Sequence, residues 1–276
     1  MRRVSPGMMV VLALLALFVV AALAAPLLTP FDPLRQSLLL RLKPPGFMQG
    51  GRIFLLGTDD LGRDLLSRTL FGARVSLLVS VVAVALSLVV GTTLGLIAGW
   101  YRGVVAVVIM RLVDTMLSIP AILLAVLTVA VLGPGFLNLV VVLGLTRWPR
   151  YARVAYGQTL QVANLPYIRA AEMAGAGTAR ILWRHILPNI AGPLMVVATS
   201  EFGLMILFEA GLSFLGLGIQ PPAPSWGSIM AAGRQYVERA WWLTVFPGAC
   251  LFLVVLCVNV TGDWLRDRLD PRAASR

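Results

Sequence analysis

Two glutamates interrupt a long apolar part of the sequence, where a carboxylate could carry chemistry. Glu201 and Glu209 are eight residues apart, so on a helix they lie on the same face. An ionisable group at membrane depth is costly and often marks a substrate path or a proton relay. We expect both side chains to face a pore or an interface with a partner chain. A protonated or hydrogen-bonded glutamate between helices is the alternative.

Two other chemistries are excluded by what the sequence lacks. Ser213, after a Gly-Leu pair, hints at an intramembrane serine protease, but such an enzyme needs a histidine in a neighbouring span. The only histidine, His185, lies in a polar stretch. The only lysine, Lys43, precedes a proline, so the Gly-Lys-Ser/Thr signature of an ATP-binding P-loop is absent. We therefore expect no enzyme activity in this chain, and any use of ATP requires partner subunits.

An acidic cluster precedes the second apolar run. Asp59, Asp60 and Asp64 surround Gly62, but their spacing is not that of a calcium loop, and we expect no metal site. Thr58 is expected to cap a short helix with two acids in its first turn. A stripe of leucines on that helix would lie on the membrane surface.

Composition sets the class of the protein. Hydrophobic residues make up 59% of the 276 residues and charged residues 13%. Several uncharged runs reach the roughly 20 residues that a helix needs to cross a ~30 Å hydrocarbon core. Spans in hydrocarbon are helical because the backbone must satisfy its own hydrogen bonds there. The net charge of +11 is scattered between the apolar runs, which indicates topology signals and lipid contacts and argues against nucleic acid.

The apolar runs predict a polytopic all-α membrane protein with six spans. We place them at residues 8–28, 75–101, 115–132, 136–148, 192–215 and 243–260. The break between the third and fourth is Gly133-Pro134-Gly135, a strong turn signal. A re-entrant hairpin is the alternative for this pair, and it would leave the sidedness of all later segments unchanged. Six spans put both termini on one side, and the excess of arginine on that side makes it cytoplasmic.

This layout predicts four segments. An N-terminal transmembrane helix covers residues 1–28, an extracytoplasmic segment with a surface helix covers 29–72, a core of five helices covers 73–264, and a cytoplasmic tail covers 265–276. Within the core we expect a cytoplasmic loop at 147–190 and an outer segment at 216–242.

The polar loop has the build of a rigid protruding element. Ala170, Ala171 and Ala174 form a small-residue helix that can pack closely into a groove. Gly175 and Gly177 allow a sharp turn after it. Pro188 is expected to bend the chain back into the membrane. An ordinary basic loop near anionic lipid is the alternative interpretation of these residues.

The same loop carries a motif. Ala170-Ala171, three residues, Gly175, nine residues and His185-Ile186-Leu187-Pro188 resemble the loop by which permease subunits of bacterial ABC importers dock onto their ATPase subunits. Residues 56–80, 212–227 and 262–271 are similar to the dipeptide/oligopeptide/nickel branch of these importers. The chain departs from the family pattern at Arg169, where members carry an acidic residue, and at His185, where they carry isoleucine.

The resemblance implies an ABC importer type I permease fold in the bacterial inner membrane. It implies as partners a second homologous permease, two cytoplasmic ATP-binding subunits and an extracytoplasmic substrate-binding protein, with peptides as the leading cargo and glutathione-like molecules or nickel complexes as others. This chain would bind no cofactor, since ATP and Mg²⁺ would lie on the ATPase subunits. Residues 165–177 would form the coupling helix, with Arg169, Ala170, Ala171, Glu172, Gly175, Ala176 and Gly177 at the contact and His185, Leu187 and Pro188 at the end of the loop.

A secondary transporter driven by an ion gradient is the rival function. It would be expected to show an inverted repeat and interrupted spans with polar groups at mid-membrane. The sequence has no evident repeat, and only Glu201 and Glu209 are candidate coupling groups.

Overall fold

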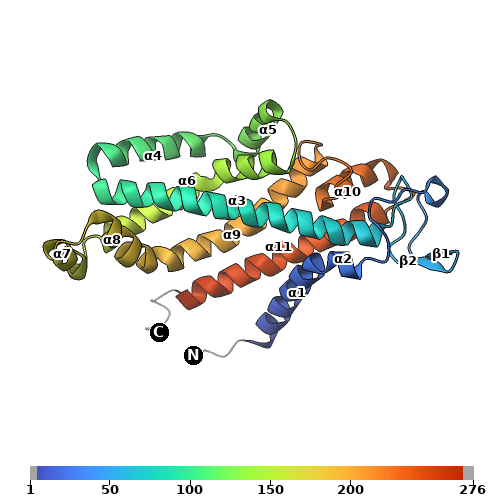
Figure 1. Ribbon diagram of the computed structural model, residues 1–276, viewed down its shortest axis with the longest axis horizontal. Helices are drawn as coiled ribbons and strands as arrows, with labels where there is room; N and C mark the ends of the chain where they lie inside the picture. The colour runs from blue at the N-terminus through green and yellow to red at the C-terminus, as the bar shows by residue number, and fades with distance from the viewer. Residues whose placement is uncertain (1–4, 270–276) are drawn as a thin grey trace. The chain divides into compact units, whose positions relative to one another are not determined.

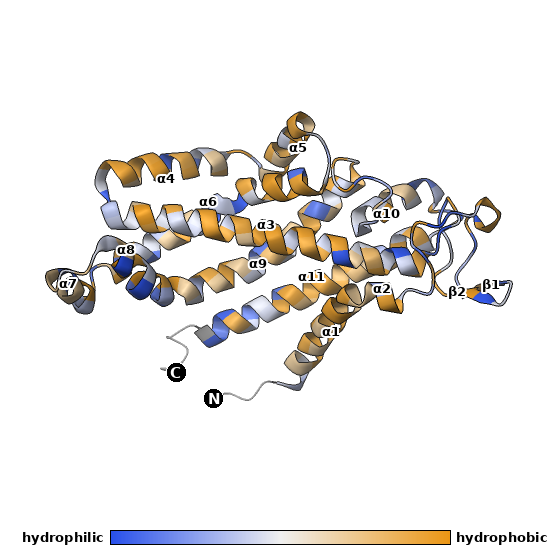
Figure 2. Ribbon diagram, in the orientation of Figure 1, coloured by the Kyte–Doolittle hydropathy of each residue, from blue (hydrophilic) through white to orange (hydrophobic). Residues whose placement is uncertain are grey.

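The fold is built from helices that carry apolar residues around most of their surface. The computed structural model describes residues 5–269. The longest helices are α1 (Pro6–Leu23), α3 (Leu65–Tyr101), α6 (Phe136–Val162), α9 (Leu187–Phe214) and α11 (Trp242–Leu269). Figure 2 shows that α1 and α5 are hydrophobic along almost their whole length. The expected helical membrane class is confirmed.

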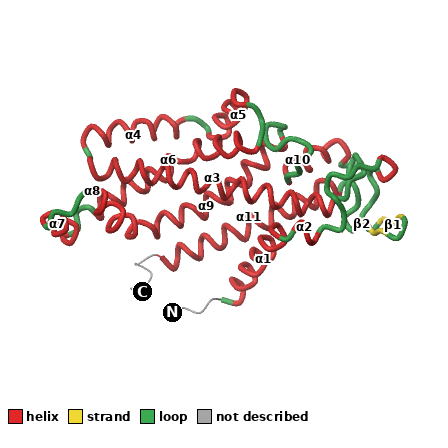
Figure 3. The backbone as a smooth tube through the Cα atoms, viewed as in Figure 1, coloured by secondary structure: helices red, strands yellow, loops and turns green. Residues whose placement is uncertain are grey.

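Shorter elements join these helices. They are α2 (Ala25–Leu28), α4 (Gly103–Ser118), α5 (Ala121–Leu132), α7 (Pro166–Met173), α8 (Thr178–Ile181) and α10 (Trp226–Gly233). Two 3₁₀ turns cover Leu38–Leu40 and Arg234–Tyr236, and a π-helical turn covers Leu182–Ile186. The segment between α2 and α3 is mostly loop (Figure 3) and contains a hairpin of β1 (Phe47–Gln49) and β2 (Arg52–Phe54) that pairs Phe47 with Phe54.

Four helical stretches within residues 5–269 are long and apolar enough to cross a membrane: Pro6–Leu23, Leu65–Tyr101, Thr178–Phe214 and Trp242–Arg268. A fifth span results if α4 and α5, which meet at 91°, are counted as one. Helix α6 is not among these stretches, and it carries three arginines in its middle. The sixth of the expected spans stays a prediction.

The third predicted span has different bounds in the structure. Helix α4 begins at Gly103, directly after α3, because Arg102 adopts a positive φ of 53° that reverses the chain. It ends at Ser118 because Pro120 disfavours helical geometry at Ile119, which is extended. The helix thus begins before the expected span start at residue 115. Helix α6 likewise continues past the expected end of the next span at residue 148, through Pro149 to Val162. The bounds of the two spans stay predictions.

The helices form two compact units. Among the described residues, unit 1 comprises 5–81, 126–140 and 202–261, and unit 2 comprises 82–125, 141–201 and 262–269. The core of unit 1 gathers apolar side chains from α1, α3, α9, α10 and α11: Ala22, Ala73, Leu77, Ile206, Trp226, Val254 and Val258. Trp226 is fully buried and its Nε1 donates to the carbonyl of Thr69 at 3.1 Å, which fixes α10 to the start of α3.

Unit 2 is held by a close approach of α3 and α6. Gly91, Gly95 and Gly99 recur every fourth residue on α3 and face α6. A Cβ on Gly95 would lie 2.5 Å from the carbonyl oxygen of Ala152, and one on Gly99 would lie 2.6 Å from Cβ of Thr159. Small residues at this spacing let membrane helices pack backbone to backbone. A second apolar cluster joins the far ends of α3 and α6 to α7, α8 and α9.

Candidate functional site

The helix expected at residues 165–177 is α7, Pro166–Met173. Pro166 occupies its first position, where a missing N–H costs nothing. At the other end Gly175 has a φ of +80°, its N–H donates to Glu172, and the N–H of Ala176 donates to Ala171. This is a Schellman motif, and the predicted turn at Gly175 is confirmed. Gly177 has an ordinary φ of −66° and instead precedes α8.

One side chain of α7 is buried and anchors the helix, while most of the others are exposed to solvent. Ile168 is fully buried and packs with Ile181, Ile186 and Ile190. By contrast Met173 is 84% exposed, and Arg169, Ala170 and Glu172 are exposed. In Figure 1, α7 lies beyond the ends of α6 and α9. The helix is therefore held firmly by one face and presents the rest to a partner or to solvent.

The end of the loop differs from the sequence prediction. After α8 the chain makes the π-helical turn Leu182–Ile186 and enters α9 at Leu187, so Pro188 is the second residue of a continuing helix. The expected bend at Pro188 was wrong, since the wider π turn removes the contact between the proline ring and the preceding turn. Figure 2 shows hydrophilic residues gathered at α8 and this turn.

An asparagine that the sequence did not reveal ties α7 to α9. Asn189 Nδ2 donates to the hydroxyl of Tyr167 at 3.0 Å and to the carbonyl of His185 at 2.6 Å. The ring of His185 contacts the Tyr167 ring edge-on, with centroids 6.5 Å apart. His185 thus has a structural contact in place of the aliphatic packing that the family's isoleucine implies. The residues around it, Leu187-Pro188-Asn189-Ile190, carry no pattern that marks Asn189 for this role.

Arg169, the departure from the family pattern, lines a cavity of about 370 Å³ at the root of α7. Its other walls are Trp100, Arg102, Ala163, Asn164 and Glu172. Arg102 Nη2 donates to Asn164 Oδ1 at 3.0 Å and so closes the turn between α3 and α4 against the end of α6. The cavity is polar and open, and it lies beside the exposed face of α7.

The structure places Glu201 in a buried charge cluster with α6. Glu201 Oε1 accepts from Arg150 Nη1 at 3.0 Å, and Arg147 Nε lies 3.7 Å from Oε2. The side chains of Glu201 and Arg147 are 1% and 10% exposed, whereas that of Arg150 is 53% exposed. Neither arginine was predicted from the sequence as a partner of Glu201, since each lies about fifty residues away from it along the chain. Their signal in the sequence was a group of arginines within a helix of otherwise apolar character.

Glu209 lies in a separate network of hydroxyl groups. Its Oε1 accepts from Ser213 Oγ at 2.8 Å, and Ser213 Oγ accepts from the backbone N–H of Ile219 at 3.1 Å. Both side chains are buried. The network fixes the turn that follows α9. Ser213 is therefore a structural bridge between α9 and the turn that follows it.

The two glutamates thus have different partners and neither reaches the surface of the chain, since both are 0% exposed. Their role in a pore or an interface stays a prediction. The contacts favour the alternative, a hydrogen-bonded or ion-paired carboxylate between helices.

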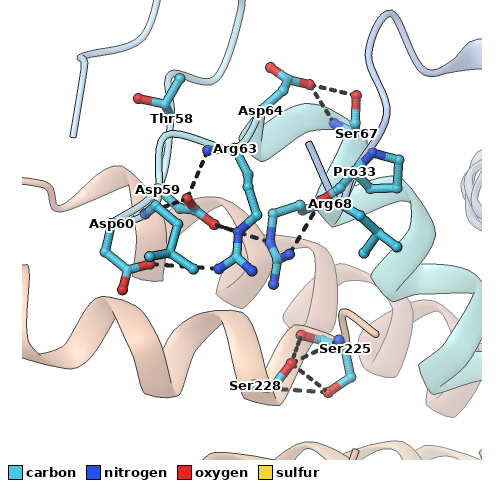
Figure 4. Close-up of polar contacts among 12 residues, drawn as sticks. Pro33, Thr58, Asp59, Asp60, Arg63, Asp64, Ser67, Arg68, Ser225 and Ser228 are labelled. Carbon is cyan, nitrogen blue, oxygen red and sulfur yellow. Dashed lines mark hydrogen bonds and ion pairs between the residues drawn. The ribbon is translucent and has the colours of Figure 1, made fainter. Parts of the chain in front are cut away.

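In the acidic cluster, the carboxylate of Asp59 binds two arginine side chains (Figure 4). Asp59 Oδ2 binds Arg63 Nε at 2.6 Å and Arg68 Nε at 3.3 Å, while its Oδ1 accepts from the N–H groups of Leu61 and Arg63. Asp64 Oδ2 accepts from the N–H and hydroxyl of Ser67 and so caps α3. Burial raises the pKa of Asp64 above its ordinary value, against the lowering effect of the Ser67 hydrogen bonds.

The expected helix capped by Thr58 was wrong. Residues 57–64 form a turn in which Gly57 and Gly62 have φ values of +80° and +72°, and Thr58 pairs with Asp64 across it. The Thr58 hydroxyl donates to the carbonyl of Leu40 and accepts from the N–H of Lys43, so it holds the preceding loop. Leu65 is fully buried rather than on the membrane surface. Within residues 5–269, no three His, Cys, Asp or Glu side chains are grouped to hold a metal ion.

Comparison with known proteins places these features in a family. Residues 91–275 match the family described as binding-protein-dependent transport system inner membrane component. The chain is 47% identical to the di/tripeptide transport system permease protein DppC of Pseudomonas aeruginosa, over 95% of this chain and 86% of that protein. It is 39% identical to the dipeptide transport system permease protein DppC of Haemophilus influenzae, over 96% of this chain and 90% of that protein.

A solved structure shares the fold. The MetNI methionine ABC transporter in inward-facing conformations has a TM-score of 0.59 at 20% identity, over 75% of this chain and 98% of that chain. The match to the family covers most of the chain, and identity to permeases of the same family exceeds 30% over nearly its full length. The chain therefore belongs to the family of binding-protein-dependent transport system inner membrane components.

Proposed function

We propose that this chain is one of two permease subunits in an ATP-driven importer of di- and oligopeptides. The observation that carries the proposal is the 47% identity to a di/tripeptide permease over 95% of the chain. The family match argues against the ion-gradient-driven transporter considered above. ATP and Mg²⁺ belong to two cytoplasmic ATP-binding subunits, and an extracytoplasmic binding protein delivers the cargo.

The proposed topology has six spans and cytoplasmic termini. The spans are α1, α3, the bent pair α4 and α5, α6, α9 and α11. Helix α6 is included because its first half is apolar and follows the apolar α5 after the turn at residues 133–135. The two helices would then cross the bilayer in opposite directions. Segment bounds are proposed as 1–28, 29–72, 73–264 and 265–276. The family match from residue 91 onwards supports a common core after the first helix and the outer segment.

In this proposal α7 is the coupling helix. Tyr167, Ala170 and Ala174 share one exposed face, since they are three and four residues apart. Small residues there allow an ATP-binding subunit to approach closely, and Ile168 transmits its movement to the core of unit 2. Closure of the ATPase dimer would then bias the permease between inward-open and outward-open states, a two-state element driven from a distance.

Substitution of Gly175 tests the docking role. A Cβ on Gly175 meets no atom within 4 Å, so the cost is not a clash inside the chain but a left-handed φ that L side chains rarely adopt. We expect Gly175→Trp to reduce co-purified ATP-binding subunit at least about tenfold while the permease stays in the membrane, a loss of roughly 1.4 kcal/mol or more. The measurement is the ratio of the two proteins after mild detergent extraction.

The control is Gly157→Ala on α6, outside the proposed docking contact, where a Cβ also meets no atom within 4 Å. It should leave the ratio unchanged. An unaltered ratio and unaltered ATP-driven peptide uptake in Gly175→Trp would refute the assignment of α7. Uptake of peptide that persists without ATP and collapses with an ionophore would refute the ATP-driven mechanism itself.

A further inference from the structure

Part of the surface of unit 2 is charged although the helices that form it are predominantly apolar. We name it the arginine face, and it consists of Arg111, Asp114, Thr115 and Ser118 on α4 with Arg150 and Arg153 on α6. All six residues are exposed. An ion pair between Arg153 and Asp114 joins the two helices, and the two side chains remain 53% and 60% exposed.

The arginine face does not lie at a polar helix end. Arg111 is eight residues after Gly103 and therefore about 12 Å along α4. Before it, the same side of α4 exposes Val104, Val107 and Val108, at 79%, 58% and 62%. After it, α5 exposes Ile122 and Leu123, at 47% and 60%. A charged surface is thus bounded on both sides by apolar surface.

Hydrocarbon cannot cover this face. A charged side chain in the hydrocarbon core is costly, and this face carries four of them: Arg111, Asp114, Arg150 and Arg153. The face must therefore meet water or another polar surface. Between two permeases, the water-filled surface is the path of the cargo.

The face also has an excess of positive charge. Three arginines of the face, Arg111, Arg150 and Arg153, are accompanied by one carboxylate, Asp114. The buried pair Arg147 and Glu201 adds one charge of each sign. Among the described residues Arg111 makes no ion pair. Arginine presents a planar fork of donors that matches a carboxylate. A surface of this kind attracts anions and repels cations.

We infer that the arginine face lines the translocation path and binds the carboxylate of the passing cargo. This rests on the proposed function and names its substrate chemistry, because every unmodified peptide has a terminal carboxylate. The ion pairs to Asp114 and Glu201 hold Arg153 and Arg150 in place, while Arg111 is the free donor.

Cysteine modification of the assembled transporter in inverted membrane vesicles tests the inference. Arg111→Cys is made in a Cys250→Ala, Cys257→Ala background and treated with methanethiosulfonates that carry either a sulfonate or a trimethylammonium group. Rates are divided by those of a free thiol in solution. We expect both reagents to react, with the anionic one favoured about tenfold by the remaining arginines. ATP-driven release of peptide loaded inside the vesicles, the direction in which an importer moves cargo across an inverted membrane, should then be restored by the cationic adduct and abolished by the anionic one.

Leu145→Cys is the matched control, since Leu145 is 44% exposed on a different side of α6 and is expected to face lipid. It should react with neither charged reagent. Absence of reaction at position 111 would mean that lipid or the second permease covers the face, and equal relative rates would mean that the face does not select anions. Either outcome overturns the inference. Failure of the Cys250→Ala, Cys257→Ala background to release loaded peptide with ATP would refute only the proposed function, since the rates of cysteine modification do not depend on transport.

Discussion

Gly95→Ala is expected to lower the thermal unfolding temperature of the detergent-solubilised permease and to reduce its amount in the membrane. The added Cβ would lie 2.5 Å from both the carbonyl oxygen of Ala152 and Cβ of Ala155. Backbone atoms cannot turn away, so α3 and α6 must separate. Overpacking of this kind costs about 1–3 kcal/mol.

The matched control is Gly157→Ala on α6. A Cβ on Gly157 meets no atom within 4 Å, so this substitution changes only the intrinsic helix preference, which favours alanine by about 1 kcal/mol. We therefore expect a higher or unchanged unfolding temperature for Gly157→Ala. Equal shifts for the two variants would show that the glycines of α3 do not set the distance to α6.

Glu201→Ala is expected to have the largest effect of a single change in unit 2. It leaves the guanidinium of Arg147, whose side chain is only 10% exposed, without its carboxylate. Breaking a buried ion pair by removing one partner costs about 3–5 kcal/mol because a buried charge is left uncompensated. The measurement is thermal unfolding of the purified permease, with retention on size exclusion as a check of folding.

Two further variants separate the effect of burial on stability from the effect of charge. Arg150→Gln removes the half-exposed partner and should cost no more than about 1 kcal/mol. Arg147→Met combined with Glu201→Leu removes both buried charges and should recover most of the loss, since apolar replacements of a buried pair are often neutral. A double variant as unstable as Glu201→Ala would show that shape rather than charge matters at this position.

Local signals in the sequence predicted helix α7 well. The helix at Pro166–Met173 and its end at Gly175 follow from a group of small residues and a C-terminal glycine, all within a dozen positions. Such features depend on neighbouring residues alone. The bend expected at Pro188 failed because the π turn before it is a property of the folded chain and has no residue signature.

Features that depend on distant parts of the chain were missed. Thr58 has the residue type and acidic neighbours of a helix cap, but its hydroxyl is taken by Leu40 and Lys43 from the preceding loop. The charge partners of Glu201 lie on another helix, 51 residues away in the case of Arg150. The spacing of Gly91, Gly95 and Gly99 was readable as a helix-packing motif, but which helix it meets was not.

Site-specific photocrosslinking from position 173 tests the central claim most directly. Met173 is 84% exposed on α7, and a photoreactive phenylalanine there should reach whatever α7 contacts in the assembled transporter. The same residue placed at Leu145 on α6 serves as the control. We expect a crosslink to an ATP-binding subunit from position 173 and none from position 145. A crosslink from position 173 only to lipid, or to the extracytoplasmic binding protein, would contradict it.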